Sequence, residues 1–210
     1  MSQTILPACL CCLLLTCCTV SVNAQWSGGL SLGANTSYYQ IDQIPNNFGE
    51  ATSGGLFGYQ AAVWLEYAVD SRWSLRSGVH FQSKQINWGL DPYWIASADR
   101  VYRMQYLGLP LTLQFMPTQR WYLKLGPQLG YLLNTPGEDE SWERWDFLLR
   151  LGAGFELGPR MAVEFEHLVG LPRVGEGQFV DDETQIEGLY AFRNRSMMVS
   201  VLYFFERSVK

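Results

Sequence analysis

The chain has 210 residues, of which 48% are hydrophobic and 14% aromatic, and a formal net charge of −5. This net negative charge argues against a nucleic acid partner, because binding to phosphate backbones needs an excess of Lys and Arg. All five Cys residues fall within the first 18 positions, so the rest of the chain cannot form a disulfide, a thiolate metal site or a thiol nucleophile.

The first 24 residues predict a secretory signal peptide. Residues 5–20 are apolar, and a site of small residues ends at Ala24. A membrane anchor is less consistent with this segment, because a spanning helix needs about 18–20 apolar residues. A lipoprotein signal ending at Cys17 is a further alternative, but a Thr stands before that Cys. We therefore expect residues 1–24 to be removed and residues 25–210 to form one exported domain.

Alternation of apolar with polar or small residues recurs along the rest of the chain. Leucines occupy every second position in most of residues 104–115, and residues 121–133 repeat the pattern after a short break containing Pro117. Successive side chains point to opposite faces of a strand, so each segment has one apolar face and one polar or glycine-rich face. The segments predicted as strands are 26–39, 56–68, 73–87, 104–115, 121–133, 145–157, 161–171 and 189–205.

The connections between these segments alternate in length. The short ones are 69–72, 116–120 and 158–160, and the long ones are 40–55, 88–99, 134–144 and 172–188. Short turns on one side and long loops on the other are typical of outer-membrane barrels. We predict an all-β fold, an eight-stranded antiparallel up-and-down transmembrane β-barrel with long extracellular loops, short periplasmic turns and both termini in the periplasm.

A soluble sandwich or a lipocalin-like barrel is the structural alternative. Three features oppose it: the apolar face is almost uninterrupted, the polar face mixes glycine with both charge signs, and aromatic residues gather at strand ends. Such aromatics form girdles at the two membrane interfaces. They are Trp73, Trp121, Tyr131, Trp145, Phe155, Tyr203 and Phe205.

The polar face of the predicted strands carries charges of both signs. The interior of an eight-stranded barrel is only wide enough to be filled by side chains, so these charges would pair and close it. We favour a structural polar core over a narrow ion path or a gate. A barrel of eight strands is also too narrow for a wide porin channel. The predicted lumen cluster is Glu66, Arg76, His80, Lys84, Lys124, Arg150, Glu156, Glu164 and Glu166.

Candidate catalytic residues are scarce. The chain contains two histidines, His80 and His167, and has no GxSxG, HExxH or phosphate-loop motif. A lipid A-modifying enzyme with a Ser–His pair would need Ser196 or Ser200 to approach one of them. We expect no enzyme, no catalytic residue, no cofactor and no metal site, and keep lipid A modification as an alternative.

Two of the predicted long loops are acidic. We favour the interpretation that these acidic residues form a solvated loop surface. The alternatives are that they bind divalent cations that bridge lipopolysaccharide, or that they dock a partner. The acidic residues are Glu138, Asp139, Glu140 and Glu143 in one loop, and Glu176, Asp181, Asp182, Glu183 and Glu187 in the other.

The central hairpin resembles the outer-membrane β-barrel domain of PorT-like proteins of Bacteroidota. The resemblance rests on Tyr106-Leu107-Gly108-Leu109-Pro110-Leu111, on Tyr122-Leu123-Lys124-Leu125-Gly126-Pro127 and on Leu129-Gly130-Tyr131, with Gly108 where the family has a Glu. It extends over nearly the whole predicted mature chain and implies an integral outer-membrane protein. One family member assists type IX secretion.

These observations predict a non-enzymatic structural or scaffolding component of the outer membrane, or one associated with secretion. The alternatives are a lipid A-modifying enzyme and a narrow solute or ion pore. The expected partners are outer-membrane lipid, lipopolysaccharide and another outer-membrane protein.

Overall fold

The computed structural model describes residues 26–42, 52–89, 100–134, 141–180 and 187–206. The predicted signal peptide, its cleavage after Ala24 and most residues of the predicted long loops lie outside these ranges. The described strands are β1 (Trp26–Asp42), β2 (Thr52–Ala68), β3 (Trp73–Gly89), β4 (Arg100–Phe115), β5 (Trp121–Asn134), β6 (Ser141–Trp142), β7 (Trp145–Gly158), β8 (Met161–Gly170), β9 (Gly175–Val180) and β10 (Glu187–Glu206).

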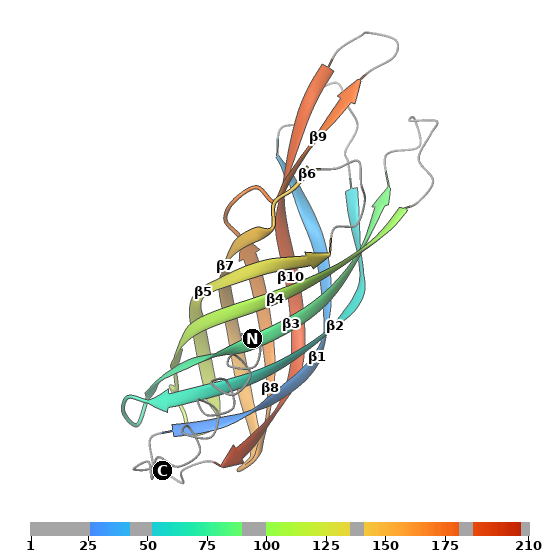
Figure 1. Cartoon of the computed structure of the whole chain (residues 1–210). Helices are drawn as coiled ribbons and strands as arrows, with labels where there is room; N and C mark the ends of the chain where they lie inside the picture. The colour runs from blue at the N-terminus through green and yellow to red at the C-terminus, as the bar shows by residue number, and fades with distance from the viewer. Residues whose placement is uncertain (1–25, 43–51, 90–99, 135–140, 181–186, 207–210) are drawn as a thin grey trace, which may run out of the picture.

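Eight long strands form a closed antiparallel barrel in the order β1-β2-β3-β4-β5-β7-β8-β10 (Figure 1). Closure comes from the pairing of β1 with β10, which runs from Gly28 opposite Glu206 to Asp42 opposite Ala191. A closed sheet has no free edge, as a bilayer without water requires. The predicted fold class is therefore confirmed.

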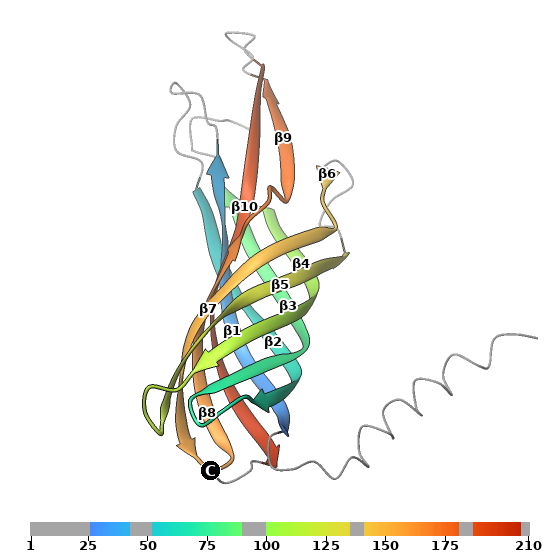
Figure 2. The same ribbon diagram turned by 90° about the vertical axis from the view of Figure 1, so that its left-hand side faces the viewer.

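Strands β6 and β9 correct the prediction, because both lie in segments that the sequence analysis assigned to loops. β9 pairs with the first part of β10, and β6 pairs with β9. This addition projects beyond the end of the barrel (Figures 1 and 2). The sequence of β9, Gly-Glu-Gly-Gln-Phe-Val, lacks an apolar alternation, and β6 has two residues, so neither leaves a periodic signal.

The predicted short turns lie at the opposite end of the barrel. Side-chain oxygens stabilise two of them: Asp70 accepts hydrogen bonds from the backbone of Arg72 and Trp73 at 2.6 and 2.8 Å, and Thr118 accepts one from Trp121 at 3.0 Å. Asp and Thr at these positions complete the turn backbone. β1 begins and β10 ends at this same end (Figure 1).

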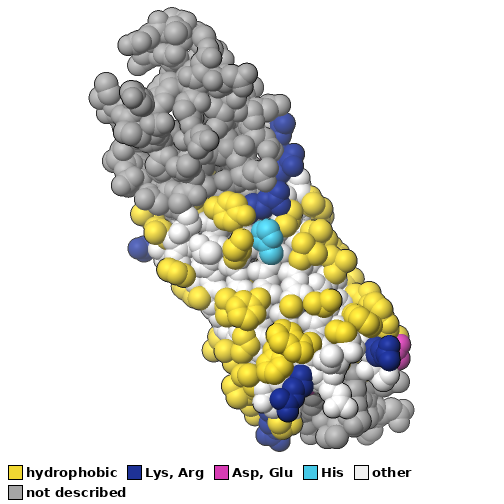
Figure 3. All heavy atoms as spheres, turned by 180° about the vertical axis from the view of Figure 1, so that it is seen from behind, with side chains coloured by type: hydrophobic (Ala, Val, Ile, Leu, Met, Phe, Trp, Pro, Cys, Tyr) yellow, Lys and Arg dark blue, Asp and Glu magenta, His cyan; other side chains and the backbone are white. Residues whose placement is uncertain are grey.

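The two faces of the barrel wall have opposite characters. Leu109 on the outer face is 54% exposed, whereas Lys124 on the inner face is 5% exposed. Hydrophobic side chains are spread over the outer wall in Figure 3. A soluble protein would have the reverse arrangement, so the wall is one that faces lipid. No helix among the described residues is long and apolar enough to cross a membrane.

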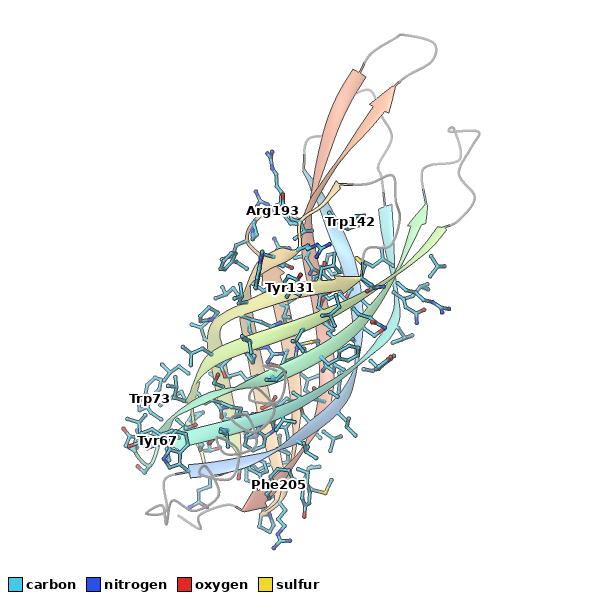
Figure 4. The ribbon with its side chains drawn as sticks, viewed as in Figure 1. Tyr67, Trp73, Tyr131, Trp142, Arg193 and Phe205 are labelled. Atoms are coloured by element: carbon cyan, nitrogen blue, oxygen red, sulfur yellow. The ribbon has the colours of Figure 1, made fainter. Side chains whose placement is uncertain are left out.

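Aromatic side chains form belts toward both ends of this wall (Figure 4). At the turn end three pairs of rings lie with centroids 4.7–5.0 Å apart: Trp26 with Tyr67, Trp73 with Phe115, and Trp121 with Phe155. At the loop end Tyr131 and Trp145 lie 4.8 Å apart. Such belts mark the two membrane interfaces and leave the apolar wall between them in the hydrocarbon.

Candidate functional site

The centre of the lumen contains a chain of ion pairs. Arg76 on β3 lies 2.7 Å from Glu66 on β2 and 2.5 Å from Glu164 on β8. β3 and β8 are not neighbours in the sheet, so the pair of Arg76 with Glu164 crosses the lumen. Each of these residues stands on the polar side of the alternation in its strand, so the sequence itself directs its side chain to the inner face.

Lys124 on β5 and Arg150 on β7 continue the chain around the lumen. The Lys124 ammonium contacts Glu164 and lies 2.5 Å from Glu166. Arg150 Nε lies 3.2 Å from Glu166, an ion pair whose geometry does not align a hydrogen bond. Three cations therefore face three carboxylates, and the network has no formal excess charge.

All six charged groups of this network are buried, with Glu166 the most exposed at 7%. Burying an isolated charge is costly, and mutual pairing offsets that cost only where further hydrogen bonds complete the site. The Tyr122 hydroxyl supplies one by donating to Glu164 at 2.6 Å. The Arg76 guanidinium also lies over the Trp64 ring, 4.4 Å from its centroid. The arrangement is that of a filled structural core.

His80 extends the network toward β2 and β10. Its Nε2 atom lies 3.2 Å from Gln60 Oε1, and Gln60 donates a hydrogen bond of 2.6 Å to Ser200. Its Nδ1 atom lies 3.5 Å from Arg150 Nη2. His80 is 3% exposed, so it is a lumen residue held by polar neighbours.

A second charged group lies nearer the loop end. Lys84 is 1% exposed, lies 4.6 Å from the Tyr106 ring centroid and interacts electrostatically with Asp146. Asp146 accepts a hydrogen bond of 2.8 Å from Asn194. The sequence analysis missed Asp146 as a lumen residue. Asp146 lies an even number of residues before Arg150, so both side chains point to the same face of the strand, and this spacing could have predicted its place in the lumen.

Eight of the nine residues predicted for the lumen are buried in it. Glu156 is the exception, because it is only partly buried near the turn end of β7. Sequence reasoning also missed Tyr122, which reads as an ordinary aromatic residue although its hydroxyl reaches the centre of the network.

Apolar layers close the lumen on both sides of the charged centre. The layer at the turn end consists of Trp64, Met116, Tyr122, Ala162, Leu202 and Phe204. The layer at the loop end consists of Ile86, Met104, Tyr106, Leu132 and Val174, with Trp142 of β6 packed against it. The backbone of Glu143 donates to Val174 at 3.0 Å, which joins the segment after β6 to the segment before β9. The additional strands thus contribute to this cover.

The free space beside the ion-pair network is small. A cavity of about 30 Å³ is lined by charged side chains of the network together with His80 and Ser200. A volume of this size accommodates little more than a water molecule or two. Charged groups and apolar layers therefore leave little free space at the centre of the described lumen.

Of the residues considered for catalysis, His80 and Ser200 line the same small cavity and are joined through Gln60. Ser196 and Ser200 face the lumen, where Ser196 lies 2.8 Å from Ser37. His167 instead faces outward, between Leu151 and Met197 in the sheet. Among the described residues there is also no group of three or more His, Cys, Asp or Glu side chains placed to hold a metal ion.

A closed antiparallel barrel with an apolar outer wall and a filled polar interior defines an outer-membrane β-barrel protein. The family model for the outer membrane protein beta-barrel domain matches residues 10–187. The chain belongs to this family, and its place is the outer membrane.

Solved structures similar to this chain include three small outer-membrane proteins. OprG from Pseudomonas aeruginosa is 12% identical with a TM-score of 0.45, over 86% of this chain and 94% of that one. Ail of Yersinia pestis is 14% identical with a TM-score of 0.45, over 87% and 100%. Neisserial surface protein A is 10% identical with a TM-score of 0.47, over 83% and 96%. No curated protein matches the sequence.

Proposed function

We propose that this protein is a non-conducting, non-enzymatic scaffold of the outer membrane, which holds the β6–β9–β10 extension in place for a protein partner outside the cell. The observation that carries the proposal is the filled lumen. A chain of buried ion pairs crosses the barrel from β3 to β8, and apolar layers lie on both sides of it. Transport through such an interior would require charged groups to separate in a low-dielectric space.

The extension projects beyond the loop end of the barrel (Figure 1). β10 has 20 residues, and its first six pair with β9. The two strands continue the barrel sheet outward as a ribbon (Figure 2). Its base is fixed, because Trp142 and Val174 pack in the apolar layer of the lumen. A ribbon anchored in a filled barrel is suited to present a binding surface.

The resemblance to PorT-like proteins supports the secretion-associated form of this proposal. The partner would then be another component of the outer membrane. The competing proposal of a narrow pore would need the central ion pairs to open. Lipid A modification would need a nucleophile beside a histidine that lipid can reach. Ser200 lines the same small cavity as His80, but both side chains are buried inside the barrel, which favours the scaffold role.

Site-specific cross-linking tests the scaffold role directly. The predicted mature chain lacks Cys, so Gln178→Cys in β9 provides a single attachment point for a photoactivatable cross-linker. The matched control is Ser71→Cys in a turn at the other end of the barrel. We expect Gln178→Cys, irradiated in intact cells, to yield a discrete cross-linked product with one outer-membrane protein that Ser71→Cys does not yield. A barrel that never forms such a product would contradict the scaffold role.

A further inference from the structure

One edge of the extension is covered by a strand of only two residues. β6 pairs with β9 at Gly175 and Glu176. The other side of β9 pairs with β10 along all six of its residues. Among the described residues, the stretch Gly177–Val180 therefore has a strand partner on one side and none on the other. An unpaired strand edge presents a row of backbone N–H and C=O groups.

The hydrogen bonds at β6 show which groups of β9 point to this edge. The backbone N–H of Glu143 donates to the carbonyl of Val174 at 3.0 Å, so Val174, just before β9, directs its carbonyl to the β6 side. In an antiparallel pair, residues that direct both backbone groups to one neighbour alternate with residues that direct both to the other. In steps of two from Val174, the backbone groups of Gln178 and Val180 point to the unpaired edge. Phe179, between them, directs its groups to β10.

This edge lacks the features by which proteins protect an exposed strand. Such edges usually carry a proline, a lysine or another charged side chain that hinders the addition of a further strand. Residues 177–180 read Gly-Gln-Phe-Val and contain none of these. The start of β4 provides a contrast, because Arg100–Met104 pairs with β3, precedes the pairing with β5 and contains two arginines. The unprotected edge of β9 is therefore suited to receive another strand.

A second copy of the chain does not fit this edge. Copies in one membrane share the same orientation, so the two-fold axis of a dimer lies along the membrane normal. The extension projects beyond the barrel along its axis (Figure 2), so two β9 edges would meet as parallel strands with equivalent residues at the same height. Each N–H would then oppose an N–H, whereas a paired strand needs donors opposite acceptors. The edge therefore fits a different polypeptide.

We infer that a partner protein adds an extended segment to β9 as a further strand, hydrogen-bonded to the backbone of Gln178 and Val180 in line with β6. The inference rests on the proposed scaffold function and specifies how the extension recognises its partner. Two N–H and two C=O groups are available to the added segment. Main-chain hydrogen bonds provide the affinity in this mode of recognition, so the partner is a protein with an extended segment not already paired in a sheet.

Proline and alanine substitutions of Gln178 separate backbone recognition from side-chain recognition. A photoactivatable phenylalanine analogue replaces Phe179, and the full-length chain is irradiated in intact cells. Gln178→Pro removes an N–H that points to the free edge and none that pairs with β10, whereas Gln178→Ala keeps this N–H. We expect the cross-linked product with the partner to fall about tenfold in Gln178→Pro and to be unchanged in Gln178→Ala.

A cross-strand disulfide verifies that Gln178→Pro leaves the ribbon of β9 and β10 intact. Glu176 and Ala191 lie opposite each other in these strands, and the predicted mature chain has no Cys. Glu176→Cys with Ala191→Cys should therefore form one disulfide wherever the strands are paired, with and without Gln178→Pro. If Gln178→Pro prevents the disulfide, Val180→Pro removes the other N–H of the edge. The same loss of product is then expected, and an unchanged yield would contradict the inference.

The remaining outcomes distinguish this inference from the scaffold role. An undiminished product from Gln178→Pro with an intact ribbon shows that the partner binds elsewhere on the extension, which overturns the inference and leaves the scaffold role. An equal loss in Gln178→Ala assigns recognition to the side chain and also overturns it. A product of twice the mass of the chain, identified by mass spectrometry as a second copy, contradicts it as well. The absence of any product from the chain without a substitution at Gln178 contradicts both proposals.

Discussion

The central ion-pair network makes a quantitative prediction at Glu164. Glu164→Leu removes the carboxylate that joins Arg76 to Lys124 and also accepts the Tyr122 hydrogen bond. Breaking a buried ion pair costs about 3–5 kcal/mol, because a charge is left uncompensated. Both cations retain a second carboxylate, which places the electrostatic loss near 3 kcal/mol, and the lost hydrogen bond adds about 1 kcal/mol. We expect the free energy of unfolding to fall by about 4 kcal/mol.

A compensated variant separates charge from packing. Glu164→Leu together with Lys124→Met removes one charge of each sign and leaves Arg76 with Glu66 and Arg150 with Glu166. We expect this variant to lose about 2 kcal/mol less than Glu164→Leu alone, because no cation is left in excess.

Urea unfolding in lipid vesicles, followed by tryptophan fluorescence, measures both values. The exposed change Glu143→Gln serves as the control and should shift the free energy of unfolding by less than about 0.5 kcal/mol. An unchanged stability of the Glu164→Leu variant, or a double variant no more stable than Glu164→Leu alone, would refute the reasoning.

Three further predictions concern packing, lipid contact and polar contacts in the lumen. Gly154→Ala would place a Cβ atom 2.1 Å from the Tyr122 ring and should cost about 1–3 kcal/mol in the same unfolding assay, whereas Gly158→Ala meets no atom within 4 Å and should be neutral. Leu109→Arg at the middle of the lipid-facing wall should cost about 2–4 kcal/mol in vesicles, and Val69→Arg in a turn at most about 1 kcal/mol; equal costs would contradict the position of the membrane. Gln60→Leu should cost about 1–3 kcal/mol, because His80 and Ser200 lose their partner inside the lumen, and a neutral result would show that these contacts do not stabilise the barrel.

The eight barrel strands could be predicted because their alternation has a physical cause that acts on each residue. Lipid on one face and a filled lumen on the other impose opposite polarities at successive positions. The pattern is lost at the loop end, where the inner face carries an apolar layer that includes Ile86 and Met104 and the outer face carries the charged Arg103. The prediction therefore began β4 at residue 104 instead of Arg100 and ended β1 at residue 39 instead of Asp42.

The contacts inside the lumen could be predicted only in part. The alternation predicts that Arg76 and Glu164 both point into the lumen. Their pairing, however, depends on how the sheet closes, because closure brings β3 opposite β8.

Planar-bilayer recording tests the filled lumen most directly. The purified full-length protein should insert into the bilayer without producing current steps, because the ion pairs and apolar layers occupy its interior. Insertion is verified independently by protease protection of the reconstituted barrel. Stable unitary currents from the wild-type protein, carried by small ions at moderate voltage, would contradict a closed interior.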